Sequence, residues 1–437
     1  MAKIEKSNQT INPFGGINFV IDAINKSGIT KLIDNQLGSR ASQAKYTYGD
    51  LVLNLWTIFF CGGDCAEDIN EHLKDFLKTV PNYKVANADT ILGVLKSLKT
   101  DNEQVESSKG NTYNINKHDD LNQLNISILK HLKLLKSNTL YDFDYDNEVL
   151  KTEKFDTKKT YKKCNGYFPG MATINGNPVY FQNRDGNMNV KTGQAEVLRD
   201  AYIMLKNNGI EINRSRMDAG SYSKDIVETV SKYSKSFYIR ANRCASLTKE
   251  LLEHKDWEKV EINNIEYEVC SIEYQPFSQT KNKEKQQDKE QKTYRLVVSR
   301  EKTKNAQQDL FTGDNMKYRS ILTNDRTSTE KQVIEYYNKR GTEEKAIDIL
   351  NNDFGWSHMP FSYMNENTVF LMFMMICKNV YTWLIAKFSK TFSGLKEHFR
   401  IKKFIFRFII VPVKWIKHSR NNIIKVFSQK SYELLKI

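Results

Sequence analysis

The chain has 437 residues, of which 40% are hydrophobic and 27% are charged. This length predicts about two or three structural units with enough apolar residues to fold without disulfides. The net charge of +14 favours a polyanionic partner. The six cysteines show no paired metal-ligand spacing, which argues against structural zinc and predicts free thiols in a reducing cytoplasm.

The longest apolar run, TVFLMFMMIC at 368–377, has ten residues and is closed by Lys378. A membrane-spanning helix needs about twenty apolar residues, so this run predicts a buried helix. The first residues lack the apolar core of a signal peptide. We therefore expect a cytoplasmic protein that does not use a membrane.

Residues 17–135 are expected to be helical. Apolar residues recur every three or four positions in INFVIDAINKSGITKLIDNQL and YGDLVLNLWTIFF. Asp89 is positioned to cap a further helix over 88–98. We predict that residues 1–135 form a helical N-terminal DNA-binding domain, although helices alone do not establish that role.

The pattern changes to strands at Asn138. The segment NTLYDFDYDNEVL alternates apolar and polar residues, and two more strands follow, joined by a turn at Asn175–Gly176. A helix over 193–209 is then followed by strand, helix and strand. This order is that of a ribonuclease-H-like α/β domain, whose first part we assign to residues 136–244.

Residues 245–325 are predicted to be a β-rich insertion that interrupts this α/β domain. Its second, helical part is expected at 326–387 and a basic, helical region at 388–437. This last region holds 12 lysines and arginines but only two acids, Glu397 and Glu433. Its basic and aromatic residues predict contact with a nucleic acid or an anionic membrane surface, or simply a solvated basic face.

Several acidic residues occupy positions suited to chemistry. Asp142, Asp144 and Asp146 alternate along one strand and should point to one face, which would have to be solvated or metal-bound. Asp218 follows another strand directly, at a turn into a helix. Taken singly, each of these acids could equally be a turn cap or a surface charge.

Glu344 lies at the start of a later helix, beside Glu343. Two carboxylates on different strands and a glutamate on a helix can converge on a pair of divalent cations that promote phosphoryl transfer. Oxygen ligands without nearby histidine or cysteine favour Mg²⁺ or Mn²⁺ over zinc.

The stretch YYNKRGTEEKAIDILNNDF contains three positions of a Y-x2-R-x3-E-x6-K pattern: Tyr337, Arg340 and Glu344. Together with RMDAGSYS and GYFPGMATINGNPVYFQNRDGN, this pattern resembles bacterial insertion-sequence transposases that carry a DDE triad. The fourth position is Asn351 where the family has lysine, which puts one DNA-contacting position in doubt.

The resemblance implies that Asp218 is the second acid of the triad and Glu344 the third. Asp146 is the predicted first acid, with Asp144 as the alternative, because strand alternation does not separate two residues that are two apart. The family implies cleavage and strand transfer of double-stranded DNA with two Mg²⁺ ions, and at least a homodimer when the ends are paired.

The resemblance also implies DNA contacts. Tyr337 and Arg340 would hold phosphates, and Arg240 and Arg243 follow a strand that should end near the site. Trp257 would stack on a base or belong to the core. Lys414 would contact the DNA backbone non-specifically.

On a helical wheel that includes the whole stretch, Arg340, Glu344 and Asn351 share one side. Ala346, Ile349 and Leu350 lie opposite and should face the core. Gly341 favours a break in the helix, which would take Arg340 out of the helical register of Glu344.

Three other readings of the sequence compete with transposition. They are a ribonuclease-H-like nuclease that cleaves without joining, a catalytically inactive DNA-binding derivative, and a basic membrane-surface protein. A membrane-surface protein would have no chemical use for the three acids Asp146, Asp218 and Glu344.

Overall fold

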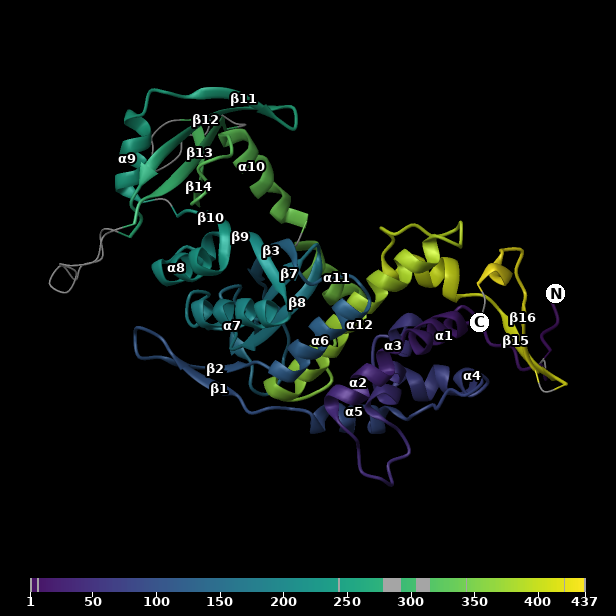
Figure 1. Cartoon of the computed structure of the whole chain (residues 1–437). Helices are drawn as coiled ribbons and strands as arrows, with labels where there is room; N and C mark the ends of the chain where they lie inside the picture. The colour runs from purple at the N-terminus through teal and green to yellow at the C-terminus, as the bar shows by residue number, and fades with distance from the viewer. Residues whose placement is uncertain are drawn as a thin grey trace.

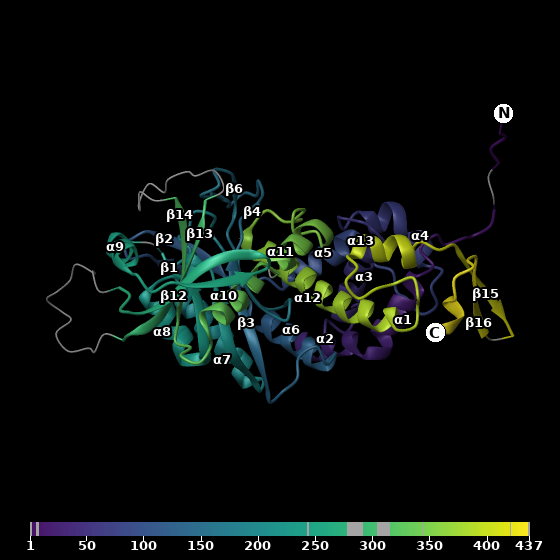
Figure 2. The same ribbon diagram turned by 90° about the horizontal axis from the view of Figure 1, so that it is seen from above.

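One eleven-stranded sheet forms half of the molecule, in the order β1-β2-β8-β7-β3-β9-β10-β14-β13-β12-β11. Helices form the other half (Figures 1 and 2). The computed structural model describes residues 2–5, 8–242, 244–277, 292–303, 315–342, 344–419 and 421–435.

The middle of the sheet begins with three antiparallel strands: β3 (Thr139–Asn147), β7 (Gly170–Ile174) and β8 (Asn177–Arg184). The predicted turn at Asn175–Gly176 joins β7 to β8. Both turn residues have positive φ, 51° and 71°, which is the conformation that tight hairpin turns require.

Two parallel strands continue the sheet on the other side of β3. β9 (Ile210–Met217) runs parallel to β3, and β10 (Ser234–Arg240) runs parallel to β9. The crossover connections are α7 (Gln194–Asn207) and α8 (Lys224–Tyr233). The helix predicted over 193–209 is therefore present, and it ends before Gly209, which has a φ of 75°.

The strands predicted as an insertion extend this same sheet. β14 pairs with β10, and β13, β12 and β11 follow in antiparallel order. Their bounds are β11 (Glu258–Ile262), β12 (Ile265–Tyr274), β13 (Tyr294–Lys302) and β14 (Met316–Thr323), with α9 (Ala245–Glu253) preceding them. The segment 245–325 is thus β-rich as predicted, whereas its status as a separate domain stays a prediction.

The N-terminal region is mostly helical, as predicted, but it also supplies one edge of the sheet. β1 (Glu103–Glu106) and β2 (Thr112–Asn116) form a hairpin that pairs with β8. β1 has one apolar residue and β2 only two, so the alternating pattern is too short to be recognised and a purely helical interpretation missed both strands. The helices and helical turns are α1 (Ile17–Ser27), α2 (Ile29–Leu37), α3 (Tyr48–Phe60), η1 (Ile69–Leu73), α4 (Lys74–Leu77), α5 (Ala88–Ser97) and α6 (Asp119–His131).

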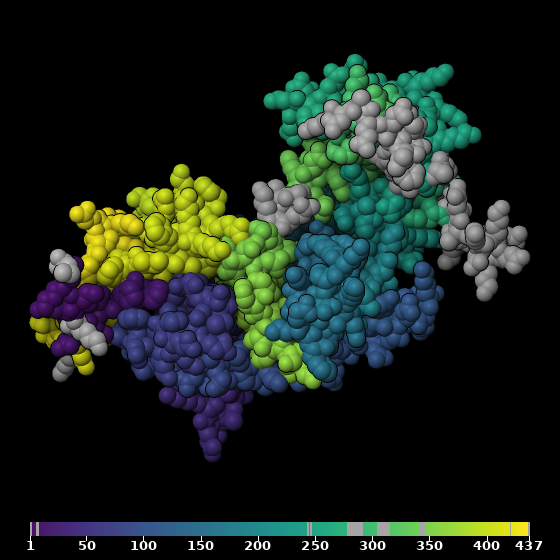
Figure 3. All heavy atoms as spheres, turned by 180° about the vertical axis from the view of Figure 1, so that it is seen from behind, coloured from purple at the N-terminus to yellow at the C-terminus, as the bar shows by residue number. Residues whose placement is uncertain are grey.

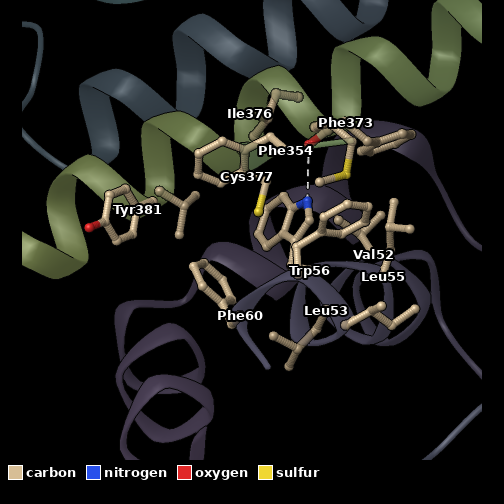
Figure 4. Close-up of a cluster of buried hydrophobic side chains, with 14 of the residues drawn as sticks. Val52, Leu53, Leu55, Trp56, Phe60, Phe354, Phe373, Ile376, Cys377 and Tyr381 are labelled. Atoms are coloured by element: carbon tan, nitrogen blue, oxygen red, sulfur yellow. Dashed lines mark hydrogen bonds between the residues drawn. The ribbon is translucent and has the colours of Figure 1, made fainter. Parts of the chain in front are cut away.

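The helix α12 (Met364–Ser389) lies between the sheet and the N-terminal helices (Figures 2 and 3). It is long and apolar enough to cross a membrane by composition alone, but 83% of its most apolar window is buried inside the protein. Trp56 of α3 is fully buried against it and donates a hydrogen bond of 3.0 Å to the carbonyl of Phe373 (Figure 4). The buried helix predicted around 368–377 is confirmed.

The C-terminal region corrects the prediction of a helical basic segment. After α13 (Ile401–Phe404) and η5 (Ile405–Ile409), the chain forms an antiparallel hairpin of β15 (Val413–His418) and β16 (Asn421–Val426), followed by η6 (Tyr432–Leu434). Pro412, which has no N–H to donate, ends the helical run. Val413 then exchanges two backbone hydrogen bonds with Asn12 near the other end of the chain.

Asp325 shapes the turn between β14 and α10 (Glu330–Asn338). Its carboxylate accepts hydrogen bonds from the backbone of Thr327 and Ser328 and from the hydroxyl of Tyr238. Burial raises the pKa of the Asp325 carboxyl, but hydrogen bonding to its ionised form outweighs burial and holds the pKa well below the usual value.

We expect Asp325→Asn to lower the free energy of unfolding at pH 7 by about 1–3 kcal/mol, because an amide cannot accept all of these bonds. A depressed native pKa stabilises the fold above the pKa of the unfolded chain, and this contribution is lost as the pH falls below about 4. Urea unfolding at pH 7 and at pH 3 measures it. If Asp325→Asn lowered the free energy of unfolding equally at pH 7 and at pH 3, the Asp325 carboxylate would not be the source of the stabilisation.

Candidate active site

The three alternating aspartates of β3 each pair with an arginine. Asp142 binds Arg214 at 2.6 and 2.9 Å, and Asp144 binds Arg216 at 2.7 Å through both of its oxygens. Both arginines lie on the neighbouring strand β9, directly opposite their partners. The sequence reading that this face must be solvated or metal-bound is therefore wrong for the first two aspartates, which the arginines neutralise.

Asp144 and Asp146, the two candidates for the first acid, differ in their surroundings. The Asp144 side chain is only 5% exposed and its partner Arg216 is 7% exposed, so this is a buried ion pair. The Asp146 side chain is 22% exposed and accepts hydrogen bonds of 3.0 Å from Arg340 and 2.9 Å from the backbone N–H of Asn147. Asp146 is thus the more accessible carboxylate.

Tyr336, which the sequence did not single out, is packed against the first two ion pairs. The guanidinium carbons of Arg214 and Arg216 lie 3.9 and 4.6 Å from the centre of its ring. Arg216 also donates a bond of 2.9 Å to the carbonyl of Tyr336. These contacts attach the end of α10 to β9. Arg214 and Arg216 are two residues apart, as are Asp142 and Asp144. This matching spacing is the sequence signal that could have predicted the two ion pairs.

Asp218 lies beside Asp146. Tyr145 of β3 is opposite Met217 of the parallel strand β9, so the next residue of each chain is an aspartate at the same edge of the sheet. Burial raises the pKa of Asp146 to about 6, with the Asp218 charge adding to the rise and Arg340 opposing it. The two carboxylates are therefore close enough for the charge of one to affect the pKa of the other.

Tyr337 supports the backbone next to Asp218. It is 7% exposed, and its hydroxyl donates a hydrogen bond of 3.2 Å to the carbonyl of Met217. In this structure the hydroxyl of Tyr337 binds the protein backbone. The contact between Tyr337 and DNA stays a prediction.

The helix assumed to carry Arg340 and Glu344 together is interrupted. Arg340 lies in the helical turn η4 (Lys339–Thr342), whereas α11 (Glu344–Asp353) begins at Glu344. The shared wheel is therefore wrong for Arg340, because the chain leaves the α-helical path around Gly341. Within α11 the predicted core side is confirmed: Ala346 and Leu350 are buried, and Ile349 packs against the core.

The side chain of Glu344 lies outside the described residues, as does Glu343. The start of α11 is nevertheless located, because Ile347 lines a small cavity of about 10 Å³ with Asp146 and Arg340. Glu344 thus belongs to the turn of helix that adjoins Asp146.

A larger cavity of about 950 Å³ opens at Asp218 and Asn147. Its other walls are formed by the β1–β2 hairpin, the segment 186–193, the first residues of α7 and α8, and the rings of Tyr161 and Phe168. The two strand-end aspartates therefore lie next to a space that accepts a sizeable ligand.

A family model described as transposase DDE domain group 1 matches residues 3–435. The chain belongs to this family of DDE transposases. The resemblance drawn from the sequence is confirmed at that level. The chain is also similar to piggyBac transposase in a cryo-EM structure of its synaptic complex with hairpin DNA, with 11% identity, a TM-score of 0.43, and coverage of 91% of this chain and 80% of that one. No curated protein matches.

For a DDE transposase, the donor groups at the strand ends fit divalent cations. Asp146 and Asp218 offer carboxylate oxygens, the ligand type that Mg²⁺ and Mn²⁺ prefer. The pKa of Asp146 is raised mainly by burial and further by the Asp218 charge, and a bound cation would offset both effects. Transposases of the DDE type generally use such ions.

The structure describes two of the remaining residues predicted to contact DNA in this part of the transposase, Arg240 and Trp257. Arg240 ends β10, with its guanidinium carbon 6.0 Å from the centre of the Tyr337 ring. Trp257 packs beneath Arg300 at 4.0 Å and donates a hydrogen bond to the carbonyl of His254, within the β-rich extension. Arg243 lies outside the described residues.

Lys414 is on β15, at the end of the molecule opposite to β11–β14 (Figure 1). The structure does not bring it to the aspartates, so a contact with DNA there would be remote from the chemistry.

Proposed function

We propose that this protein cuts DNA at the ends of an insertion sequence and joins the freed 3′-hydroxyls to target DNA. One observation carries the proposal: Asp146 and Asp218 lie at the C-terminal ends of neighbouring parallel strands, in a chain that the DDE family model matches almost throughout. Acids at this edge of an α/β sheet are suited to a shared catalytic site.

The strand order supports a ribonuclease-H-like assignment for the centre of the sheet. β8, β7 and β3 are antiparallel, β9 and β10 are parallel to β3, and helices connect β8 to β9 and β9 to β10. We assign the catalytic core to 136–244 and 326–387, the β-rich insertion to 245–325, DNA binding to 1–135, and a basic accessory region to 388–437.

Asp146, Asp218 and Glu344 would hold two Mg²⁺ or Mn²⁺ ions in this proposal. Bound there, the ions would activate the attacking oxygen and stabilise the leaving oxygen in an in-line phosphoryl transfer. Burial raises the pKa of Asp146 to about 6, and a cation bound there would favour the ionised carboxylate.

Other residues would position the DNA and the acids. Arg340 places a guanidinium beside Asp146, and a planar guanidinium binds phosphate oxygens in pairs. Tyr337 holds the Met217 carbonyl, which fixes the strand end that carries Asp218. The proposed partner is double-stranded DNA, bound by a homodimer in the bacterial cytoplasm at the nucleoid.

Cleavage of labelled transposon-end DNA in the presence of Mg²⁺ tests the proposal. We expect wild-type protein to cleave, and Asp218→Ala and Glu344→Ala to lose at least about 10³-fold in rate. The matched control is Glu228→Ala, an exposed acid of α8 that does not line the cavity. Equal cleavage by the wild type and both site variants would refute the assignment.

A nuclease of the same fold that does not join DNA is the second candidate, favoured by the fact that the same acids would serve cleavage alone. A strand-transfer assay with pre-cleaved ends and a target plasmid separates the two. Joined products establish transposition, and cleavage without joined products establishes the nuclease. A protein that binds the ends but does neither is the inactive derivative.

A further inference from the structure

The cavity beside Asp218 has no assigned occupant. Asn147, which lines it, directly follows Asp146, so an occupant lies next to both strand-end aspartates. We infer that this cavity binds an unpaired segment of DNA, a few nucleotides long, next to the phosphate that is cleaved. The inference rests on the proposed function and adds a specific binding site to it.

An exposed aromatic ring stands at the cavity wall. Tyr161 is 67% exposed, and Phe168 contacts it edge-on with ring centres 5.6 Å apart. Single-stranded nucleic acids bind by stacking bases on aromatic side chains, irrespective of sequence. The ring of Tyr161 is thus a stacking surface that a base in the cavity can use.

The cavity wall also contains a polar side chain that is held in place. Asn147 donates from its Nδ2 to the carbonyl of Pro169 at 3.1 Å, which fixes the side-chain amide. The amide is therefore a fixed, polar part of the cavity wall next to the strand-end aspartates.

The charges favour bases inside the cavity and phosphates at its edge. Two lysines and four acids line the cavity, so its wall is unfavourable to a run of phosphates. The adjoining segment 151–163, which carries Tyr161, holds six lysines and two acids. The segment packs closely against Gly186 of the cavity wall, because a Cβ on this glycine would lie only 2.8 Å from the carbonyl oxygen of Lys158.

The test uses a DNA duplex with three unpaired nucleotides at one end, one of them 2-aminopurine, bound to the full chain with Ca²⁺ in place of Mg²⁺. We expect quenching of the aminopurine on binding. Tyr161→Ala should lose this quenching and weaken binding on the order of tenfold, whereas Tyr161→Phe should retain both. The matched control is Phe155→Ala, an 81% exposed aromatic in the same lysine-rich segment but outside the cavity lining, which should behave as wild type.

Wild-type affinity and quenching in Tyr161→Ala would overturn the inference, and so would an equal loss in Phe155→Ala. A blunt duplex should be insensitive to Tyr161→Ala, and equal sensitivity would also count against the site. Because no cleavage is measured, these failures leave the proposed function standing. Failure of that function shows instead as unchanged cleavage by Asp218→Ala.

Discussion

Asp146→Asn is expected to abolish Mg²⁺-dependent cleavage of transposon-end DNA, by at least about 10³-fold, while the protein stays folded. The substitution removes the negative charge that a cation would need beside Asp218. The free energy of unfolding should change by no more than about 1–2 kcal/mol, because the asparagine oxygen can still accept the bond from Arg340. Cleavage rates and urea unfolding of the same preparation measure the two effects.

Asp142→Asn is the matched control for this variant. Asp142 lies on the same strand and the same face, but its partner is Arg214 and it is remote from Asp218 in the strand register. We expect this control to cleave at close to the wild-type rate. If Asp146→Asn cleaved DNA as fast as this control, Asp146 would not be the first acid of the triad. Asp144 would then be the candidate.

Asp144→Ala is expected to lower the free energy of unfolding by about 3–5 kcal/mol, because it leaves the guanidinium of Arg216 buried without its carboxylate. Replacing both partners, as in Asp144→Leu with Arg216→Met, should recover most of that loss, since neither charge then remains buried. Denaturant unfolding of the two single variants and the double variant gives the coupling between them.

The exposed pair on the same strand provides the comparison. Asp142 and Arg214 have side-chain exposures of 27% and 39%, so Asp142→Ala should cost only about 1 kcal/mol or less. Losses of equal size for Asp142→Ala and Asp144→Ala would show that the Asp144–Arg216 pair is no more important to the fold than its neighbour.

The sequence predicted the acids better than their partners. Alternation along β3 places Asp144 and Asp146 on one face. It cannot tell which of the two is the catalytic acid, because the two are an even number of residues apart on the strand. The distinction comes from β9, whose parallel register puts Arg216 opposite Asp144 and Asp218 next to Asp146. Sequence periodicity describes one strand at a time, so a pairing between strands some seventy residues apart was not accessible to it.

The errors have the same origin. The helical wheel placed Arg340 with Glu344 because the spacing is right for one helix, whereas the chain forms a separate helical turn at Lys339–Thr342. The C-terminal hairpin is paired to the N-terminal segment through Asn12 and Val413, a partnership between opposite ends of the sequence. The strands of 245–325 were recognised, but only tertiary pairing shows that they continue the central sheet.

The position of α12 limits how the protein can move. One side chain, Asn379, donates to both Asn125 and the carbonyl of Pro178, and Glu366 accepts from Lys96 and Lys99. The helix is thus bonded to the N-terminal helices and to the start of β8 alike. The helical half therefore cannot rotate as a rigid body relative to the sheet without breaking these contacts of α12.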